Sequence, residues 1–159
     1  MIWLLACTGS EVPGGAGLLA EDYVGPGELT MEFVSDSTDT GESNDVLHLR
    51  SEDGLWTFRR GERWSDATVV GEYATELNDE GFFVGEDQVL PHRLEEGETS
   101  EHGVTVVALG ELEVWYGTFP MVVRVEVTEG LPGEHAFGEG VGPVRLELVD
   151  MVWELAYYE

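Results

Sequence analysis

The sequence has almost no positive charge. It contains 159 residues with no lysine, and its seven Lys and Arg residues, all arginine, stand against 33 Asp and Glu, so the formal net charge is −26 at pH 7. Nucleic-acid binding depends mainly on Lys and Arg side chains that neutralise phosphates, and anionic lipid headgroups attract the same side chains. The composition therefore excludes nucleic acids as partners, and it excludes electrostatic attachment to a membrane surface.

Cysteine and long apolar segments are scarce as well. Cys7 is the only cysteine, which excludes an intramolecular disulfide. No apolar run approaches the roughly 18 residues that a membrane-spanning helix needs. With 42% hydrophobic, 10% aromatic and 25% charged residues, the composition is nevertheless that of a globular protein, and the length fits a single domain.

Motifs of common enzyme classes are also missing. The chain has no Gly-x-Ser-x-Gly or His-Glu-x-x-His motif and no phosphate-binding glycine loop with a lysine. The four histidines, His48, His92, His102 and His135, are too scattered to indicate a zinc site. We therefore expect a protein that is not an enzyme and needs no cofactor. Because a pair of catalytic carboxylates is defined by distance and leaves no motif, a carboxylate-based hydrolase remains the alternative.

The first residues resemble the lipobox of a bacterial lipoprotein. In Leu4-Leu5-Ala6-Cys7, an apolar segment that ends in a small residue precedes a cysteine, which in a lipobox receives the lipid. A complete signal sequence has a charged segment and roughly 7–15 apolar residues before this point. Only six residues, without Lys or Arg, precede Cys7. Either the start is assigned too late, or the similarity is accidental and Cys7 is a small buried side chain of the core.

Glycine and proline follow Cys7 and favour a flexible connection. Residues 12–17 read Val-Pro-Gly-Gly-Ala-Gly, and Val24-Gly25-Pro26-Gly27 again interrupts regular structure. We therefore predict a truncated lipoprotein signal, a lipobox and a disordered tether over residues 1–27, and a single antiparallel β domain over residues 28–159. A lipid on Cys7 would place that domain in a bacterial cell envelope, periplasmic or at the cell surface, touching the membrane only through the anchor.

From residue 28 onward, apolar and polar residues alternate with the period of a strand that is buried on one face. In Met121–Thr128, Val123 and Val125 point one way, whereas Arg124 and Glu126 point the other. Similar segments are Leu29–Phe33, Val46–Arg50, Leu55–Arg59, Ala67–Val70, Val104–Val107, Glu111–Tyr116, Val144–Leu148 and Met151–Tyr158. No segment long enough for a helix carries an apolar stripe at helical spacing.

Turn residues separate these segments. Asp53-Gly54 is a tight-turn signal, and Leu109-Gly110-Glu111 is short enough for a second hairpin. The sequence therefore predicts an all-β fold, an antiparallel meander that forms a curved half-barrel, a barrel or a sandwich. Most acidic residues occupy outward strand positions or loops, so we expect their charge to coat the surface.

Short motifs follow a recognisable order over roughly the last two thirds of the chain. They are Leu55–Arg59, Gly117–Phe119, Val122–Glu126, Gly140–Val144 and Trp153–Tyr157. In this order, over roughly residues 54–158, the chain resembles TapB-like bacterial envelope proteins, which are commonly lipoproteins and largely of unknown function. The resemblance implies a curved antiparallel sheet, similar to the open barrels of lipoprotein carriers, and it supplies no catalytic residues.

Aromatic residues are spread over the predicted strands. Trp56 and Phe58 share one face of their strand, and Trp115 and Trp153 belong to later strands. Such residues usually fill the core of a small barrel, but they can also line a concave cup for an acyl chain or another apolar ligand. We take these four as the candidate cup. The sequence thus favours a lipid-anchored, non-enzymatic envelope protein that binds an apolar small molecule or an envelope protein partner, or has a structural role.

A second candidate site is the acidic segment 36–45. Asp36, Asp39 and Asp45, with the hydroxyl and amide side chains between them, offer the oxygen ligands that Ca²⁺ prefers. Leu47 stands where an EF-hand has its bidentate glutamate, so the segment is not an EF-hand. A solvated hairpin loop is the simpler interpretation, and a calcium-dependent adhesion module is the alternative function.

Overall fold

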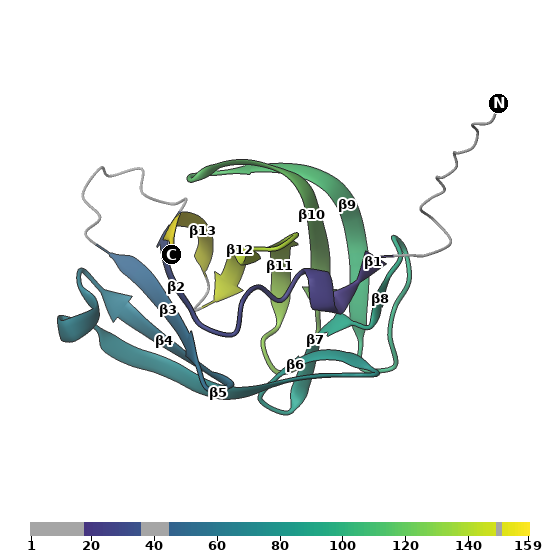
Figure 1. The fold of residues 1–159 in the computed structure, drawn as a ribbon, viewed down its shortest axis with the longest axis horizontal. Helices are drawn as coiled ribbons and strands as arrows, with labels where there is room; N and C mark the ends of the chain where they lie inside the picture. Colours follow the sequence, from purple (N-terminus) through teal and green to yellow (C-terminus); the bar gives the residue numbers. More distant parts are fainter. Residues whose placement is uncertain (1–17, 36–44, 149–150) are drawn as a thin grey trace.

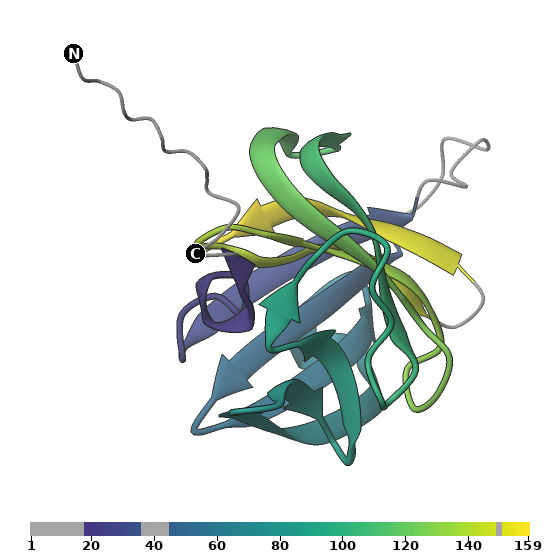
Figure 2. The same ribbon diagram turned by 90° about the vertical axis from the view of Figure 1, so that its right-hand side faces the viewer.

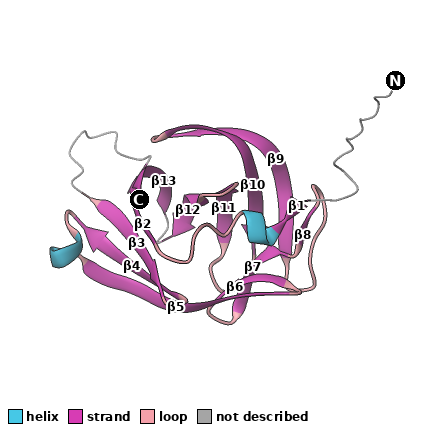
Figure 3. Ribbon diagram, in the orientation of Figure 1, coloured by secondary structure: helices cyan, strands magenta, loops and turns pink. Residues whose placement is uncertain are grey.

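The structure, a computed structural model, describes residues 18–35, 45–148 and 151–159. Cys7 with the predicted lipobox, and Asp36 and Asp39 of the acidic segment, lie outside these ranges. Within them nearly all regular structure is β-strand, and the two short helical elements are single 3-10 turns, η2 (Ala20–Asp22) and η3 (Trp64–Asp66) (Figure 3). The all-β prediction is confirmed.

Eleven strands form one antiparallel sheet in the order β7-β6-β5-β4-β3-β2-β13-β12-β11-β10-β9. Their bounds are β2 (Leu29–Ser35), β3 (Val46–Glu52), β4 (Leu55–Gly61), β5 (Thr68–Asn78), β6 (Gly81–Val84), β7 (Asp87–Pro91), β9 (Val104–Val114), β10 (Gly117–Val127), β11 (Gly133–Gly138), β12 (Gly142–Leu148) and β13 (Met151–Tyr158). Two further strands, β1 (Leu18–Leu19) and β8 (Arg93–Leu94), pair with each other. Neighbours in this order are consecutive along the chain except where β13 pairs with β2, so the meander returns to its own beginning.

The sheet curves round until its two edges approach each other (Figures 1 and 2). The edge strand β7 packs against β9 and β10 without forming a ladder with either. Among the half-barrel, barrel and sandwich that the sequence left open, the described residues therefore form a nearly closed barrel-like sheet. Its concave face encloses the apolar core.

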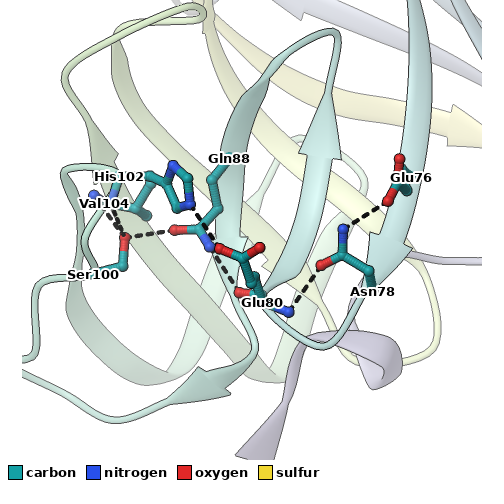
Figure 4. Close-up of polar contacts among 7 residues, drawn as sticks. All are labelled: Glu76, Asn78, Glu80, Gln88, Ser100, His102 and Val104. Carbon is teal, nitrogen blue, oxygen red and sulfur yellow. Dashed lines mark hydrogen bonds and ion pairs between the residues drawn. The ribbon is translucent and has the colours of Figure 1, made fainter.

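Side chains close the seam between the two edges (Figure 4). Gln88 of β7 is 3% exposed; its amide donates to the backbone oxygen of Glu80 (2.7 Å) and accepts from the Ser100 hydroxyl (2.5 Å). That hydroxyl accepts in turn from the backbone N–H of Val104, the first residue of β9 (3.2 Å). The ring of His102 lies 3.1 Å from the Glu80 carboxylate on the outside. This network provides hydrogen-bond partners for backbone groups near the two edges, which an open sheet edge leaves unpaired.

Alternate residues of the strands fill the interior. The facing predicted for Met121–Thr128 is confirmed, since Val123 and Val125 are fully buried whereas Glu126 is exposed. The largest side chains of the core that are less than 2% exposed are Trp153, Tyr23, Phe33, Phe58 and Phe137. The sheet supplies both sides of this core, because it curves back over its own apolar face.

Residues 18–27, which the sequence placed in the tether, belong to the folded domain. Ala20 and Tyr23 are fully buried, and the backbone N–H of Ala20 donates to the carbonyl oxygen of His92 (2.9 Å). Gly25 adopts a positive φ of 80°, and a Cβ atom there would collide with the backbone of Val141. The boundary predicted at residue 28 is therefore wrong. Gly25 allows close packing, whereas the sequence suggested flexibility.

The hairpin predicted at Leu109-Gly110-Glu111 is also wrong. Strand β9 continues through Gly110, which pairs with Val122 of β10 beside a β-bulge. The turn lies at Trp115 and Tyr116, and the long β9–β10 hairpin arches over β13 (Figure 1). The backbone N–H of Tyr116 donates to the carbonyl oxygen of Leu155 (2.7 Å) and fixes the tip of this hairpin. Here glycine bends a strand, a role that local sequence does not distinguish from a turn.

The turn at Asp53-Gly54 is confirmed. It joins β3 and β4, and both residues have positive φ, 53° and 75°. This pair of conformations is typical of a two-residue hairpin turn and favours glycine at the second position.

Substitutions on the two faces of β10 test the facing of the sheet. Val125→Asp places a carboxylate in the closed core and should lower the free energy of unfolding by about 3 kcal/mol or more. Glu126→Lys changes a charge on the exposed face and should alter it by no more than about 0.5 kcal/mol. Urea denaturation of the three proteins measures the difference, and equal losses for both variants would contradict the assignment.

Candidate functional site

A groove of about 640 Å³ lies between β5 and the connection from β10 to β11. We call it the β5 groove; it is lined by Phe58, Val70, Gly71 and Tyr73 on one wall and by Leu131, Pro132, Gly133, Glu147 and Leu148 on the other. Its volume lies within the range of roughly 300–1,000 Å³ that is usual for small-molecule sites. The β5 groove is thus large enough for a small molecule and is mostly apolar.

A β-bulge shapes the first wall. Strands β4 and β5 pair Phe58 with Gly71 and Arg59 with Val69, so Val70 is the extra residue of β5. A bulge leaves one residue unpaired and bends its strand. Val70 is consequently 39% exposed although it is apolar, and it lines the β5 groove.

Two aromatic rings complete this wall. Phe58 is 1% exposed, and its ring meets that of Tyr73 edge to face, with the centroids 6.1 Å apart. The ring of Tyr73 lies over Gly71, where a Cβ atom would come within 2.7 Å of it. Only glycine leaves room for this approach, so Gly71 sets the position of the Tyr73 ring.

His135 holds the second wall together. Its Nε2 atom lies 2.8 Å from the carbonyl oxygen of Leu131, and its Nδ1 atom lies 3.2 Å from the backbone N of Glu147. A nitrogen that faces a carbonyl donates and one that faces an N–H accepts, so the ring is neutral with its proton on Nε2. The β11–β12 ladder extends only to the pair Ala136 and Arg145. Beyond that point, the His135 ring links the two strands.

Burial lowers the pKa of His135. The ring is 1% exposed, and desolvation disfavours the charged imidazolium more than the Leu131 carbonyl and the carboxylates of Glu147 and Glu134 favour it. Protonation at Nδ1 would also replace an acceptor with a donor opposite the N–H of Glu147. Both effects favour the neutral ring that the hydrogen bonds require.

Glu147 is the only charged residue among the described residues that line the β5 groove. Its Oε1 atom accepts from the backbone N–H of Glu134 (2.9 Å). Gly133 lies against this carboxylate, and a Cβ atom there would collide with it. The half-buried side chain is therefore held in one position by the backbone around it.

Of the four residues of the predicted cup, Phe58 alone lines the β5 groove. Trp56 and Trp153 are 3% and 0% exposed and fill the core, where the indole N–H of Trp153 donates to the carbonyl oxygen of Leu148 (3.0 Å). Trp115 lies at the β9–β10 turn and is 72% exposed. The structure therefore does not bring the four together: three point inward from β4 and β13, and the fourth lies on a hairpin tip.

Of the three predicted calcium ligands, Asp45 is described. Its carboxylate binds the guanidinium of Arg60, with the closest atoms 2.7 Å apart. In the part of the chain that the structure describes, no three His, Cys, Asp or Glu side chains lie close enough to hold a metal ion.

The seam brings together the residue types of a catalytic triad, but in another arrangement. The Ser100 hydroxyl donates to Gln88 and accepts from the backbone of Val104, and the ring of His102 faces Glu80 (Figure 4). Among the described residues, the ring of His102 forms no hydrogen bond with that hydroxyl. A nucleophile needs its base within hydrogen-bonding reach. We therefore assign this cluster to closing the barrel.

The sequence carries weak signals for the lining residues that it did not single out. Val69-Val70 breaks the alternation of its strand, as a bulge does, and Gly71 precedes the aromatic Tyr73 by two positions. Leu131-Pro132 places two apolar residues in a predicted loop. None of these signals shows that the two segments face each other.

Comparison with protein-family models, with curated proteins and with solved structures found no match. Among the described residues, no helix combines the length and the apolarity that crossing a membrane requires. The resemblance to TapB-like proteins stays a prediction.

The lowered pKa of His135 predicts a loss of stability in mild acid. The unfolded chain, in which the histidine pKa is near 6.5, binds this proton more readily than the folded one. The contribution of the neutral His135 ring to the free energy of unfolding is therefore complete above pH 6.5. It is lost as the pH falls below 6.5, by at most about 1.4 kcal/mol per pH unit. Urea denaturation of the wild type and of His135→Gln at pH 7 and pH 5 measures it.

The matched control is His92→Gln, at a half-buried histidine outside the β5 groove. The carboxylates titrate in every one of these proteins, so their contribution cancels in the comparison. The pH dependence should be reduced in His135→Gln alone. An unchanged slope in that variant would contradict the assignment.

Proposed function

We propose that the protein is a non-enzymatic carrier or receptor that binds an apolar small molecule in the β5 groove. The observation that carries this proposal is the apolar wall that Val70 and Tyr73 present to Leu131 and Leu148 on an otherwise acidic molecule. Exposed apolar surface of this kind is unfavourable in water, and covering it contributes about 25 cal/mol per Å².

The walls of the β5 groove are held in place without a ligand. The bulge and Gly71 position Val70 and Tyr73, and the His135 ring ties Leu131 to Glu147. Binding to such a site orders few side chains, so little of the gain from apolar contact is lost to conformational entropy. This supports binding over a structural role alone.

The charges around the β5 groove support binding over hydrolysis. A glycosidase places two carboxylates about 5–9 Å apart on either side of the bond that it cleaves. Among the described residues that line the β5 groove, Glu147 is the only acid, and one of its oxygens already accepts a backbone hydrogen bond. We therefore propose no reaction there.

We further propose that a lipid on Cys7 anchors the domain in a bacterial cell envelope. The lipobox-like Leu4-Leu5-Ala6-Cys7 and the resemblance to TapB-like proteins support this location. With a net charge of −26 the domain surface is repelled by anionic headgroups, so attachment to the membrane depends on the lipid alone. A single acyl chain binds membranes only marginally, whereas the several chains of a lipoprotein hold firmly.

Val70→Asp tests ligand binding in the β5 groove. Val70 and Val107 are apolar strand residues of nearly equal exposure, 39% and 38%, and only Val70 lines the β5 groove. A carboxylate at position 70 must lose water when an apolar ligand covers it, so affinity should fall at least about tenfold. Fluorescence titration with N-phenyl-1-naphthylamine, a neutral apolar probe, measures the affinity.

Val107→Asp is the control and should bind the probe as the wild type does. Wild-type protein that leaves the probe fluorescence unchanged would refute the proposed function. An equal loss of affinity in both variants would move the binding site away from the β5 groove.

The anchor is tested on protein expressed in a bacterial host together with its native upstream coding region. Mass spectrometry should find a lipid on Cys7 and the protein in the membrane fraction, whereas Cys7→Ser should lack the lipid and be released. An unmodified Cys7 in that preparation would remove the anchor from the proposal.

A further inference from the structure

The β5 groove has one charge, and that charge is negative. In the described structure neither Arg nor His is among its lining residues, and Glu147 contributes the carboxylate. Arg145, two residues earlier on β12, forms no ion pair with Glu147. The charge of Glu147 is therefore not neutralised by a neighbouring side chain.

The carboxylate of Glu147 can accept further hydrogen bonds. Its Oε1 atom takes the backbone N–H of Glu134, whereas Oε2 has no hydrogen-bond partner among the described residues. An ionised carboxylate accepts up to about four hydrogen bonds. Because the backbone of Gly133 and Glu134 fixes the first oxygen, the second is held ready for a donor.

The opposite wall suits a cation as well. The half-buried ring of Tyr73 lines this wall, and the ring of Phe58, which is 1% exposed, packs against it edge to face. An alkylammonium group is attracted to aromatic faces, and this attraction gains strength where water is excluded. An anionic head group would meet like charge at Glu147 and find no basic side chain in the lining.

From this geometry we infer that the ligand is a cationic amphiphile, an apolar body with a protonated amine or quaternary ammonium head that binds against Glu147. This inference rests on the proposed function, because it concerns the same groove. The net charge of −26 adds a weaker, salt-dependent attraction for any cation. It is the carboxylate inside the groove that makes the recognition specific.

The experiment compares ligands that share a chain and differ in the sign of the head group. Decyltrimethylammonium and decanoate, both below their micelle-forming concentrations, compete with bound N-phenyl-1-naphthylamine at pH 7.5 and physiological salt. Wild-type protein should release the probe at a concentration of decyltrimethylammonium at least about tenfold below that of decanoate. Equal competition, or a preference for decanoate, would overturn the inference.

Glu147→Gln keeps an amide oxygen for the N–H of Glu134 and removes the charge, so it should lose most of this preference. Glu126→Gln removes the same charge from the exposed face of β10 and should keep the preference. A preference that survives Glu147→Gln would assign the selectivity to net charge and overturn the inference. If the probe binds wild-type protein and the head groups do not differ, the proposed function stands and only the cationic class fails.

Discussion

The structure depends on one constraint: a single antiparallel sheet buries its apolar face against itself. The described residues offer no helical layer to cover that face, since both helical elements are single turns. The sheet therefore curves until β13 meets β2 on one side and β7 approaches β9 on the other. The first contact is a hydrogen-bonded ladder, and the second is closed by the side chains of Gln88 and Ser100. Burial of Phe33, Phe58 and Trp153 follows from this closure.

The β5 groove lies where regular strand pairing is interrupted. On one side the bulge at Val70 bends β5, and on the other the β11–β12 ladder stops short of His135 and Glu147. A ring and a carboxylate take over the hydrogen bonds that the ladder leaves unmade. The features that interrupt regular pairing thus also create the apolar hollow, and they hold it open without a ligand.

The excess of acidic residues shapes the surface and the energetics. Self-repulsion among so many carboxylates destabilises the folded state at low salt and keeps molecules apart. The few arginines are used locally: Arg60 binds Asp45, and Arg50 and Arg59 lie over the ring of Trp64, with guanidinium-to-centroid distances of 4.2 and 4.3 Å. A molecule of this charge favours cationic ligands before any site is considered, and Glu147 adds a specific acceptor.

The alternation of residues was sufficient to predict the fold class and the facing of β10, because it reflects burial on one side of a strand. It does not show how far each strand runs, and the turn predicted at Gly110 is wrong because β9 passes through that residue. The same limit applies to the cup. Alternation assigns Trp56 and Phe58 to the inner face, and both are buried, but only the closure of the sheet places Phe58 beside the groove and Trp56 away from it.

Pairing between distant segments accounts for the rest of what the sequence left unpredicted. Leu131 and Val70 line one groove because the curved sheet brings β5 and the connection from β10 to β11 to its two sides, and no local pattern encodes that arrangement. Tyr23 is buried for a similar reason. Its segment is too short to show an alternation of apolar and polar residues, but its side chain belongs to the core that the curved sheet encloses. The sequence pattern therefore identifies the strands, whereas the closure of the sheet determines the site.

The central claim, that an apolar ligand enters the β5 groove, is tested most directly by methyl NMR. In protein with labelled valine and leucine methyl groups, addition of decyltrimethylammonium should shift the signals of Val70, Leu131 and Leu148. The signals of Val107 on β9 should stay unchanged. Shifts that are absent from those three residues and gather at Val114, beside the exposed Trp115, would contradict the account.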